Sequence, residues 1–407
     1  MTATPLRPTS STPPARTRVP TGWYSPADCS LDDFRSIVEG GLAETSLDDH
    51  PYADALEQGV LVYGSRLREH TTTAEGRRDV QAELARALAD GPGIVVFKGA
   101  FDHDDVDRAT GVFAAMIEEQ RAAGTASGDH FAKPGANDRV WGALDKLAVR
   151  APEVFARYYA NDVLALVSEA WLGRGYQVTS QVNVVNPGGQ AQTAHRDYHL
   201  GFMDQAQALG YPAQVHALSP VLTLQGAVAH VDMPVETGPT LYLPHSQKHP
   251  AGYIAFHRRE FTQYFLEHSV QLPLAKGDAA FFNPALFHGA GTNRSTDVRR
   301  MANLLQVSSG FGRAMEDVDR VAASKALFGA LSAQKAAGVD ERSLRNVVAA
   351  SAEGYAFPTN LDRDQPIDGL APQTQAELVW QALSEGWDAA RLEEALDAQA
   401  ARRRSAV

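Results

Sequence analysis

Between about residues 176 and 310 the sequence alternates short apolar runs with turn-forming residues. The runs are too short for typical buried helices and are rich in β-branched residues, which is typical of strands. Asn-Pro-Gly-Gly at 186–189 and Lys-Gly-Asp at 276–278 separate them as turns. This pattern predicts an antiparallel barrel or sandwich. The runs are YQVTSQVNVVNPGG, VLTLQGAVAHVDM, GPTLYLPHS, QLPLAKGDAAFFNP and NLLQVSSGFG.

Helical sequence patterns flank this β region on both sides. Residues 31–92 read mostly as helix, because TTTAEGRRDVQAELARALADG spaces its apolar residues by three to four positions and ends in Gly. GIVVFKGAF at 93–101 predicts a buried strand, 102–124 predicts a further helix, and 128–144 predicts a loop rich in Gly, Pro and Asn. The helical pattern returns at 311–407. We therefore expect helices around a central β core.

The first 22 residues, MTATPLRPTSSTPPARTRVPTG, predict a disordered leader, since Pro, Thr, Ser and Arg leave no core-forming periodicity. An organellar transit peptide has a similar composition, but the prolines would break its amphipathic helix. The expected organisation is a leader at 1–22, a β-rich domain with N-terminal helices at 23–310 and a helical extension at 311–407.

Charge and composition exclude several classes of function. The 407-residue chain has a formal net charge of -12, which argues against a nucleic-acid partner because phosphate contacts need clustered Lys and Arg. No apolar stretch reaches the roughly 18 residues that span a bilayer, and no signal-peptide pattern is found, so we expect no membrane partner and a cytoplasmic location. The single cysteine, Cys29, excludes an internal disulfide and a Cys-based zinc site.

TAHRDYHLGF, residues 193–202, brings two histidines and an aspartate close together. Residues i and i+2 of a strand point to the same face, so His195 and Asp197 project together. One imidazole and one carboxylate give two adjacent ligands for a divalent metal, and a third ligand is required. His199 is either a fourth ligand or, as we favour, a residue of the surrounding pocket.

The most suitable third ligand is His288, which follows the apolar, strand-like run AAFFNPALF. Arg299 lies eleven residues further on, so a hairpin would return its guanidinium to the metal, where it could bind a carboxylate bidentately. His245 and His249 fall in a polar turn, and His230 has no arginine at a useful distance downstream. We expect these three histidines to be structural.

Two histidines and one carboxylate on one face of a metal leave open coordination positions, as in non-haem Fe(II) oxygenases. A 2-oxoacid such as 2-oxoglutarate would occupy two of these positions and O2 the last, while Arg299 would hold the far carboxylate. The expected cofactors are therefore Fe(II), 2-oxoglutarate and O2. The alternative is a cupin-like metal protein with hydrolase or isomerase chemistry, in which Arg299 would have no function.

The stretches HRDYH, VETGPTLYLPHSQKH and GDAAFFNPALFHGAGTNRSTDVRR resemble the phytanoyl-CoA dioxygenase family of Fe(II)/2-oxoglutarate-dependent oxygenases. The similarity covers about residues 90 to 310. It implies an α+β fold with a double-stranded β-helix core, also called a jelly roll or cupin-like core, and flanking N-terminal and C-terminal helices. It also implies that His195, Asp197 and His288 ligate iron and that Arg299 forms the salt bridge with 2-oxoglutarate.

The same resemblance suggests further contacts with the cosubstrate. Asn183, on the strand before the His-x-Asp motif, matches such a contact. Family members often carry a small hydroxyl residue two positions after the distal histidine, but this chain has Ala290 there. Thr292 or Thr240 is therefore the remaining candidate for this contact.

The substrate is expected to be a small molecule, bound by a monomer or homodimer. Residues of the 128–144 loop could cover the mouth of the barrel and contact a polar or anionic substrate, although an ordinary solvated loop is the alternative. A residue that shares a strand face with Asn183 could line the same cavity. The candidates are Lys133, Arg139, Trp141, Gln181 and His199.

The resemblance implies hydroxylation of a substrate C–H bond, with release of succinate and CO2. Halogenating relatives replace the metal-binding carboxylate with a small residue, so Asp197 argues against halogenation. Desaturation and ring formation use the same ligands and stay open. The substrate also stays open, since members act on acyl-CoA thioesters, amino acids, compatible solutes and natural-product intermediates.

Overall fold

Two β-sheets packed face to face form the centre of the molecule in the computed structural model, which describes residues 22–125, 136–366 and 369–405. The larger sheet has the strand order β1-β2-β3-β9-β6-β11-β5-β4, and the smaller has the order β10-β7-β8. Apart from the parallel pair β2 and β3, the described neighbours are antiparallel. The protein thus has the predicted α+β fold with a double-stranded β-helix core. The strands are β1 (Ala55–Glu57), β2 (Val60–Tyr63), β3 (Ile94–Phe97), β4 (Asn137–Val140), β5 (Gln177–Val185), β6 (Thr223–Ala229), β7 (Leu241–Leu243), β8 (Val270–Gln271), β9 (Ala279–Phe282), β10 (Phe287–Gly289) and β11 (Arg300–Ser308).

The inner strands of the large sheet bury alternate residues on its two faces. In β3, Val95 and Phe97 pack toward the helices, whereas Ile94 and Val96 pack toward the small sheet. Strands β2 and β9 divide their side chains in the same way. Burial on both faces explains why these strands read as continuous apolar runs.

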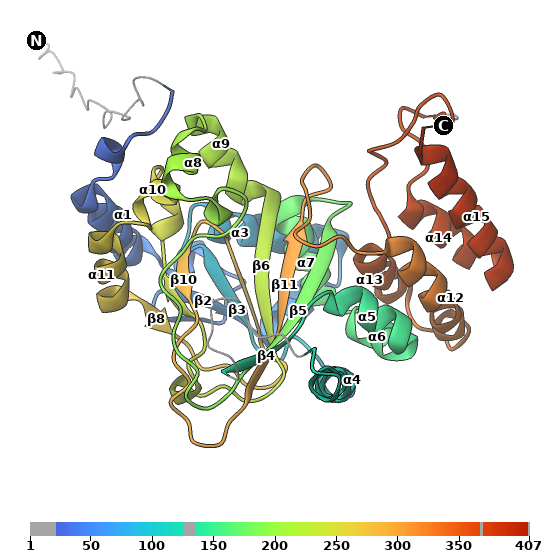
Figure 1. Cartoon of the computed structure of the whole chain (residues 1–407), viewed down its shortest axis with the longest axis horizontal. Coiled ribbons are helices and arrows are strands. Elements are labelled where there is room, and N and C mark those ends of the chain that lie inside the picture. Colours follow the sequence, from blue (N-terminus) through green and yellow to red (C-terminus); the bar gives the residue numbers. More distant parts are fainter. Residues whose placement is uncertain (1–21, 126–135, 367–368, 406–407) are drawn as a thin grey trace, which may run out of the picture.

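Helices cover the outer face of the large sheet and the outer side of the small sheet (Figure 1). Helix α1, blue in Figure 1, packs with α10 and α11 beside the small sheet. Helices α12 to α15, brown to red, lie at the opposite end, where α12 packs against α5 and α6. None of the described helices is long and apolar enough to cross a membrane. The helices are α1 (Leu31–Glu44), α2 (Ser65–His70), α3 (Ala74–Ala89), α4 (His103–Ala122), α5 (Ala143–Arg150), α6 (Pro152–Tyr158), α7 (Asp162–Leu172), α8 (Gln205–Leu209), α9 (Ala213–Leu218), α10 (Gly252–Ala255), α11 (Arg259–His268), α12 (Arg320–Ala336), α13 (Glu341–Ser351), α14 (Gln375–Glu385) and α15 (Ala389–Arg403).

Several elements agree with the sequence. The side chains of Ser30, Thr73 and Asp102 cap α1, α3 and α4 by accepting backbone N–H groups. The predicted strand at 93–101 is β3, and the predicted helix at 102–124 is α4.

Two segments differ from the prediction. The stretch 31–92 is mostly helical, as predicted, but between α1 and α2 it also contains the β1-β2 hairpin, whose turn at Gln58 and Gly59 has positive φ angles of 51° and 78°. Part of the predicted loop at 128–144 is strand β4, which pairs with β5. The predicted leader lies almost wholly outside the described residues, which begin at Gly22.

Candidate functional site

His195, Asp197 and His288 come together between the two sheets. His195, in the loop after β5, forms an antiparallel bridge with His288 on β10, and each backbone N–H donates to the other's carbonyl at 3.0 and 3.1 Å. Asp197 Oδ2 lies 3.9 Å from His195 Nε2 and 3.4 Å from His288 Nε2. Among the described residues this is the one group whose ligand atoms, all within 4.8 Å of one another, could hold a metal ion.

Backbone carbonyls hold both imidazoles in the orientation that metal binding requires. Nδ1 of His195 lies 2.8 Å from the Thr193 carbonyl oxygen, and Nδ1 of His288 lies 2.9 Å from that of Leu286. Because a carbonyl can only accept, each Nδ1 carries the hydrogen. The Nε2 lone pairs are therefore available for a metal on the side of Asp197.

The Asp197 carboxylate is held in its ionised form. Burial raises its pKa, but the nearby imidazoles of His195 and His288, when protonated, and a hydrogen bond from Gln225 lower it by more than burial raises it, so the net pKa lies below its usual range. Gln225 Nε2 donates to Oδ2 at 2.5 Å from strand β6. Sequence reasoning missed Gln225, since no local motif connects it with Asp197.

The three side chains line a cavity of about 190 Å³ that also contains a buried arginine, Arg300. Arg300 is 7% exposed, and its Nη1 donates to the Thr237 carbonyl at 3.2 Å. Burial lowers the pKa of its guanidinium to about 10, so it stays protonated near neutral pH. No carboxylate among the described residues forms an ion pair with it, which makes this end of the cavity suited to an anion.

The predicted cosubstrate arginine, Arg299, does not line the cavity. Its side chain is half-exposed and donates to Asn186 at 3.1 Å and to Asp138 at 3.2 Å. The difference follows from the register of β11, which begins at Arg300 and directs every second residue into the cavity. Arg300, and not Arg299, therefore lines the cavity of the His-Asp-His cluster.

The other predicted cosubstrate residues are distributed as follows. Asn183 and Thr240 line the cavity. Thr292 does not, because its hydroxyl accepts the backbone N–H of Ala191 at 3.0 Å outside it. Tyr242, directly opposite His288 on β7, lines the cavity beside them.

Three of the five predicted substrate residues line the cavity, in the region that we call its outer part, which is lined by Arg139, Trp141, Gln181, Tyr198 and Met315. The three are Gln181, Arg139 and Trp141, and the Arg139 guanidinium lies 4.4 Å from the centre of the Trp141 ring. His199 lies outside it, because Tyr198 has a positive φ of 41° and turns the chain before His199. Lys133 falls outside the described residues.

A segment that follows β11 closes the outer part of the cavity. Met315 lines it, with its sulfur 2.8 Å from the Tyr198 hydroxyl and 3.4 Å from Gln181 Nε2. Glu316 accepts hydrogen bonds from the Gly142 N–H at 2.8 Å and from Gln181 Nε2 at 3.3 Å, and burial raises its pKa. Sequence reasoning missed both residues, which lie in a part of the chain without a recognisable motif.

The remaining candidate histidines have structural environments. His230 is buried between the hydroxyls of Thr110 and Tyr158, at 2.8 and 3.0 Å, and burial lowers its pKa to about 3. His245 and His249 are also buried, and none of these three histidines lines the cavity that contains the His-Asp-His cluster.

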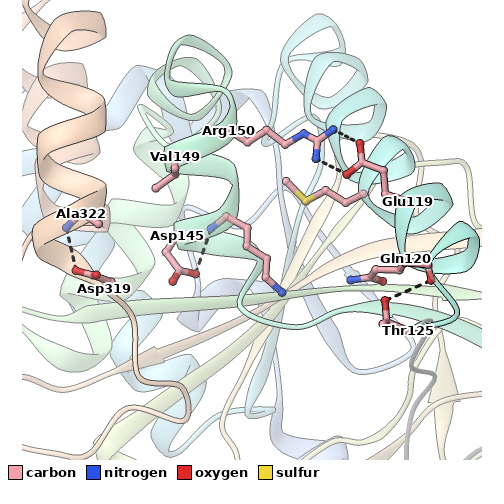
Figure 2. Close-up of a pocket in the computed structure, with 11 residues that line it drawn as sticks. Glu119, Gln120, Thr125, Asp145, Val149, Arg150, Asp319 and Ala322 are labelled. Carbon is pink, nitrogen blue, oxygen red and sulfur yellow. Dashed lines mark hydrogen bonds and ion pairs between the residues drawn. The ribbon is translucent and has the colours of Figure 1, made fainter.

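A second cavity, of about 640 Å³, lies on the outside between α4, α5 and the start of α12 (Figure 2). Its charged groups are engaged with the protein itself: Arg150 pairs with Glu119, and Asp319 accepts the N–H of Ala322. We therefore assign the functional site to the cavity that contains the His-Asp-His cluster.

Comparison with known families decides the class of protein. The family model described as phytanoyl-CoA dioxygenase matches residues 89–301, slightly more than half of the chain. The chain belongs to the phytanoyl-CoA dioxygenase family. The oxygenases of this family depend on Fe(II) and 2-oxoglutarate, and two imidazoles, one carboxylate and a buried unpaired arginine fit these cofactors. The cofactors are therefore Fe(II) and 2-oxoglutarate, as predicted, which disfavours the cupin-like alternative.

More distant likenesses are found among solved structures. The α-ketoglutarate-dependent epimerase SnoN from nogalamycin biosynthesis is 20% identical over 57% of this chain and 84% of its own, with a TM-score of 0.40. AviO1 from Streptomyces viridochromogenes Tue57 is 16% identical over 57% of this chain and 95% of its own, with a TM-score of 0.42. HygX from Streptomyces hygroscopicus, solved with nickel, 2-oxoglutarate and hygromycin B, is 16% identical over 56% and 88%, with a TM-score of 0.39. These likenesses are too distant to bear on the reaction, and no curated protein matches the chain.

Proposed function

We propose that this member of the phytanoyl-CoA dioxygenase family hydroxylates a C–H bond of a small organic substrate and releases succinate and CO2. One observation carries this proposal. The ligand atoms of His195, Asp197 and His288 lie within 4.8 Å of one another, in the same cavity as Arg300. A 2-His-1-carboxylate site combined with a buried cation suits a metal that shares its coordination sphere with an anionic cosubstrate.

Each residue has a defined task in this proposal. His195, Asp197 and His288 hold Fe(II), and Gln225 fixes the position of the Asp197 carboxylate. Arg300 binds the far carboxylate of 2-oxoglutarate, with Asn183 and Thr240 as further contacts. When bound, Fe(II) with 2-oxoglutarate supplies the activation of O2 that oxidises the substrate.

The outer part of the cavity positions the substrate and excludes water. Arg139, Trp141 and Gln181 line this part, and Met315 and Tyr198 close it. A substrate C–H bond that is placed between these residues would face the iron ligands. Desaturation and ring formation require the same ligands, whereas the carboxylate of Asp197 argues against halogenation.

We further propose that residues 23–310 form the oxygenase domain and 311–407 a helical extension that contributes Met315 to the cavity. The protein acts on its small-molecule substrate as a monomer or homodimer, without nucleic acid or membrane.

The proposed reaction predicts that one atom of O2 enters succinate. The loaded enzyme is incubated under ¹⁸O2 with 2-oxoglutarate and a library of small molecules, and succinate is analysed by mass spectrometry. We expect succinate with one ¹⁸O and a product that has gained one oxygen atom. A product that has lost two hydrogens would show that the reaction is desaturation or ring formation and not hydroxylation. If no succinate forms, the proposal is contradicted.

A further inference from the structure

A groove of about 1190 Å³ lies where the segment after β11 meets the C-terminal helices. Its walls come from residues 310–321, from residues 353–358 and from the end of α15. Met315 lines this groove and also lines the active-site cavity. Met315 therefore lies between the active-site cavity and the groove.

Aromatic rings form one wall of the groove. The side chain of Phe311 is 77% exposed, which is unusual for a phenylalanine. Its ring lies edge-on to Tyr355 at 5.2 Å, and Tyr355 lies 5.7 Å from the Phe357 ring. A row of partly exposed rings is typical of a surface that binds an apolar ligand.

A guanidinium group with unused donors lies in the same groove. Nε and Nη2 of Arg403, at the end of α15, are shielded from solvent and have no hydrogen-bond partner among the described residues. Buried donors are nearly always paired in proteins, so an anion in the groove would supply the missing acceptor once the Arg403 side chain turns toward it. Arg313 and Arg404, both exposed, add positive charge beside them.

Acidic residues of the groove are mostly engaged with the protein. Glu353 accepts the N–H of Tyr355 at 3.1 Å, and Asp319 accepts that of Ala322 at 2.9 Å. Glu316 accepts the N–H of Gly142 at 2.8 Å. The fourth acid, Asp317, is exposed. Four arginines and four acids line the groove, so the preference for an anionic ligand rests on the unpartnered Arg403 donors and not on net charge.

We propose that this groove binds the distal part of the substrate, and that this part combines an apolar ring system with an anionic group. The rings would pack on Phe311, Tyr355 and Phe357, and the anion would accept the Arg403 N–H groups. The reactive end would pass Met315 into the cavity. This inference rests on the proposed oxygenase function and adds a substrate class to it.

A pair of fluorescent probes tests the groove without knowledge of the substrate. One probe, 8-anilinonaphthalene-1-sulfonate, carries aromatic rings and an anion, and the other, N-phenyl-1-naphthylamine, carries the same rings without the charge. Both are titrated into the anaerobic full-length protein loaded with Fe(II) and 2-oxoglutarate. We expect saturable binding of the sulfonate, weakened at least about 10-fold by Arg403→Ala, because a shielded charge-assisted hydrogen bond is lost.

The matched variants separate the two parts of the proposal. Arg403→Ala should leave the affinity for the neutral probe within about 2-fold, whereas Phe311→Ala should weaken both probes. Arg391→Ala is the control, since Arg391 lies on the same helix over the Trp387 ring and does not line the groove. If Arg403→Ala does not fold, as judged by its circular dichroism, Arg403→Gln replaces it.

The inference is overturned if wild-type protein does not bind the sulfonate or if Arg403→Ala binds it as tightly as wild type. It is also overturned if Arg403→Ala weakens both probes equally, because the anion would then have no role. The same wild-type sample is scanned for the visible charge-transfer band of iron-bound 2-oxoglutarate. Absence of that band contradicts the proposed function, whereas a band without discrimination between the probes contradicts the groove alone.

Discussion

The two ends of the active-site cavity are built in different ways. The inner end is formed by paired strands, so that Arg300 on β11 and Tyr242 on β7 are directed inward by the sheet register. The outer end combines two strand residues, Arg139 on β4 and Gln181 on β5, with residues beyond strand ends, such as Trp141 after β4 and Met315 after β11. Backbone hydrogen bonds fix the inner end, whereas side-chain contacts such as that of Tyr198 with Met315 fix the outer end.

This contrast separates the shared chemistry from substrate selection. The inner end and the strand residues of the outer end lie within residues 89–301, which match the family, while Met315 and Phe311 lie beyond them. In the proposed function, strands hold the groups that bind the cofactors, and connecting segments supply part of the contacts with the substrate.

The largest expected effect is at the inner end. Replacement of Arg300 by Ala removes the buried cation that we propose pairs with the 2-oxoglutarate carboxylate, so we expect a loss of about 2–5 kcal/mol, or at least roughly 30-fold in Kd. Arg299→Ala is the matched control, since Arg299 pairs with Asp138 outside the cavity. Isothermal titration calorimetry of the metal-loaded variants with 2-oxoglutarate measures the Kd of each. A greater loss in Arg299→Ala than in Arg300→Ala would reverse the assignment.

A smaller effect is expected from the residue that holds the iron-binding carboxylate. Gln225→Leu removes the hydrogen bond to Asp197 and should weaken Fe(II) binding by about 10-fold. A chelator competition under anaerobic conditions measures the iron affinity, and the melting temperature of the apoprotein shows whether the fold is intact. Unchanged iron affinity in a folded variant would mean that Gln225 does not position the ligand.

The smallest effect is expected at the outer end. Tyr198→Phe removes the hydroxyl contact with the Met315 sulfur, worth about 1 kcal/mol. Amide hydrogens of residues 309–319 should then exchange about 5-fold faster, while those of 300–308 in strand β11 should not change. Hydrogen exchange with mass spectrometry resolves both segments. Equal acceleration in both would show that the two ends are not independent.

The sequence predicts the core fold and the cluster of His195, Asp197 and His288 because both depend on local patterns. Alternating apolar runs and turn residues indicate the strands, and His195 with Asp197 occupies one face at a spacing of two residues. His288 is found because its apolar strand and following arginines resemble a known family.

The sequence does not predict features that depend on register or on distant contacts. Arg299 and Arg300 are adjacent, and a shift of one residue exchanges the two faces of a strand, so spacing alone could not choose between them. The polar run at 137–140 becomes strand β4 only by pairing with β5. Gln225 and Met315 reach the site from separate segments. The β1-β2 hairpin, in contrast, had a readable signal in its Gln-Gly turn.

The most direct test of the account is an anaerobic titration of the apoprotein with Fe(II) and then 2-oxoglutarate, followed by visible absorption. We predict a weak metal-to-ligand charge-transfer band that saturates at one 2-oxoglutarate per chain and is lost in His288→Ala. Iron binding without this band would contradict the account and would favour a cupin-like metal protein that does not use 2-oxoglutarate.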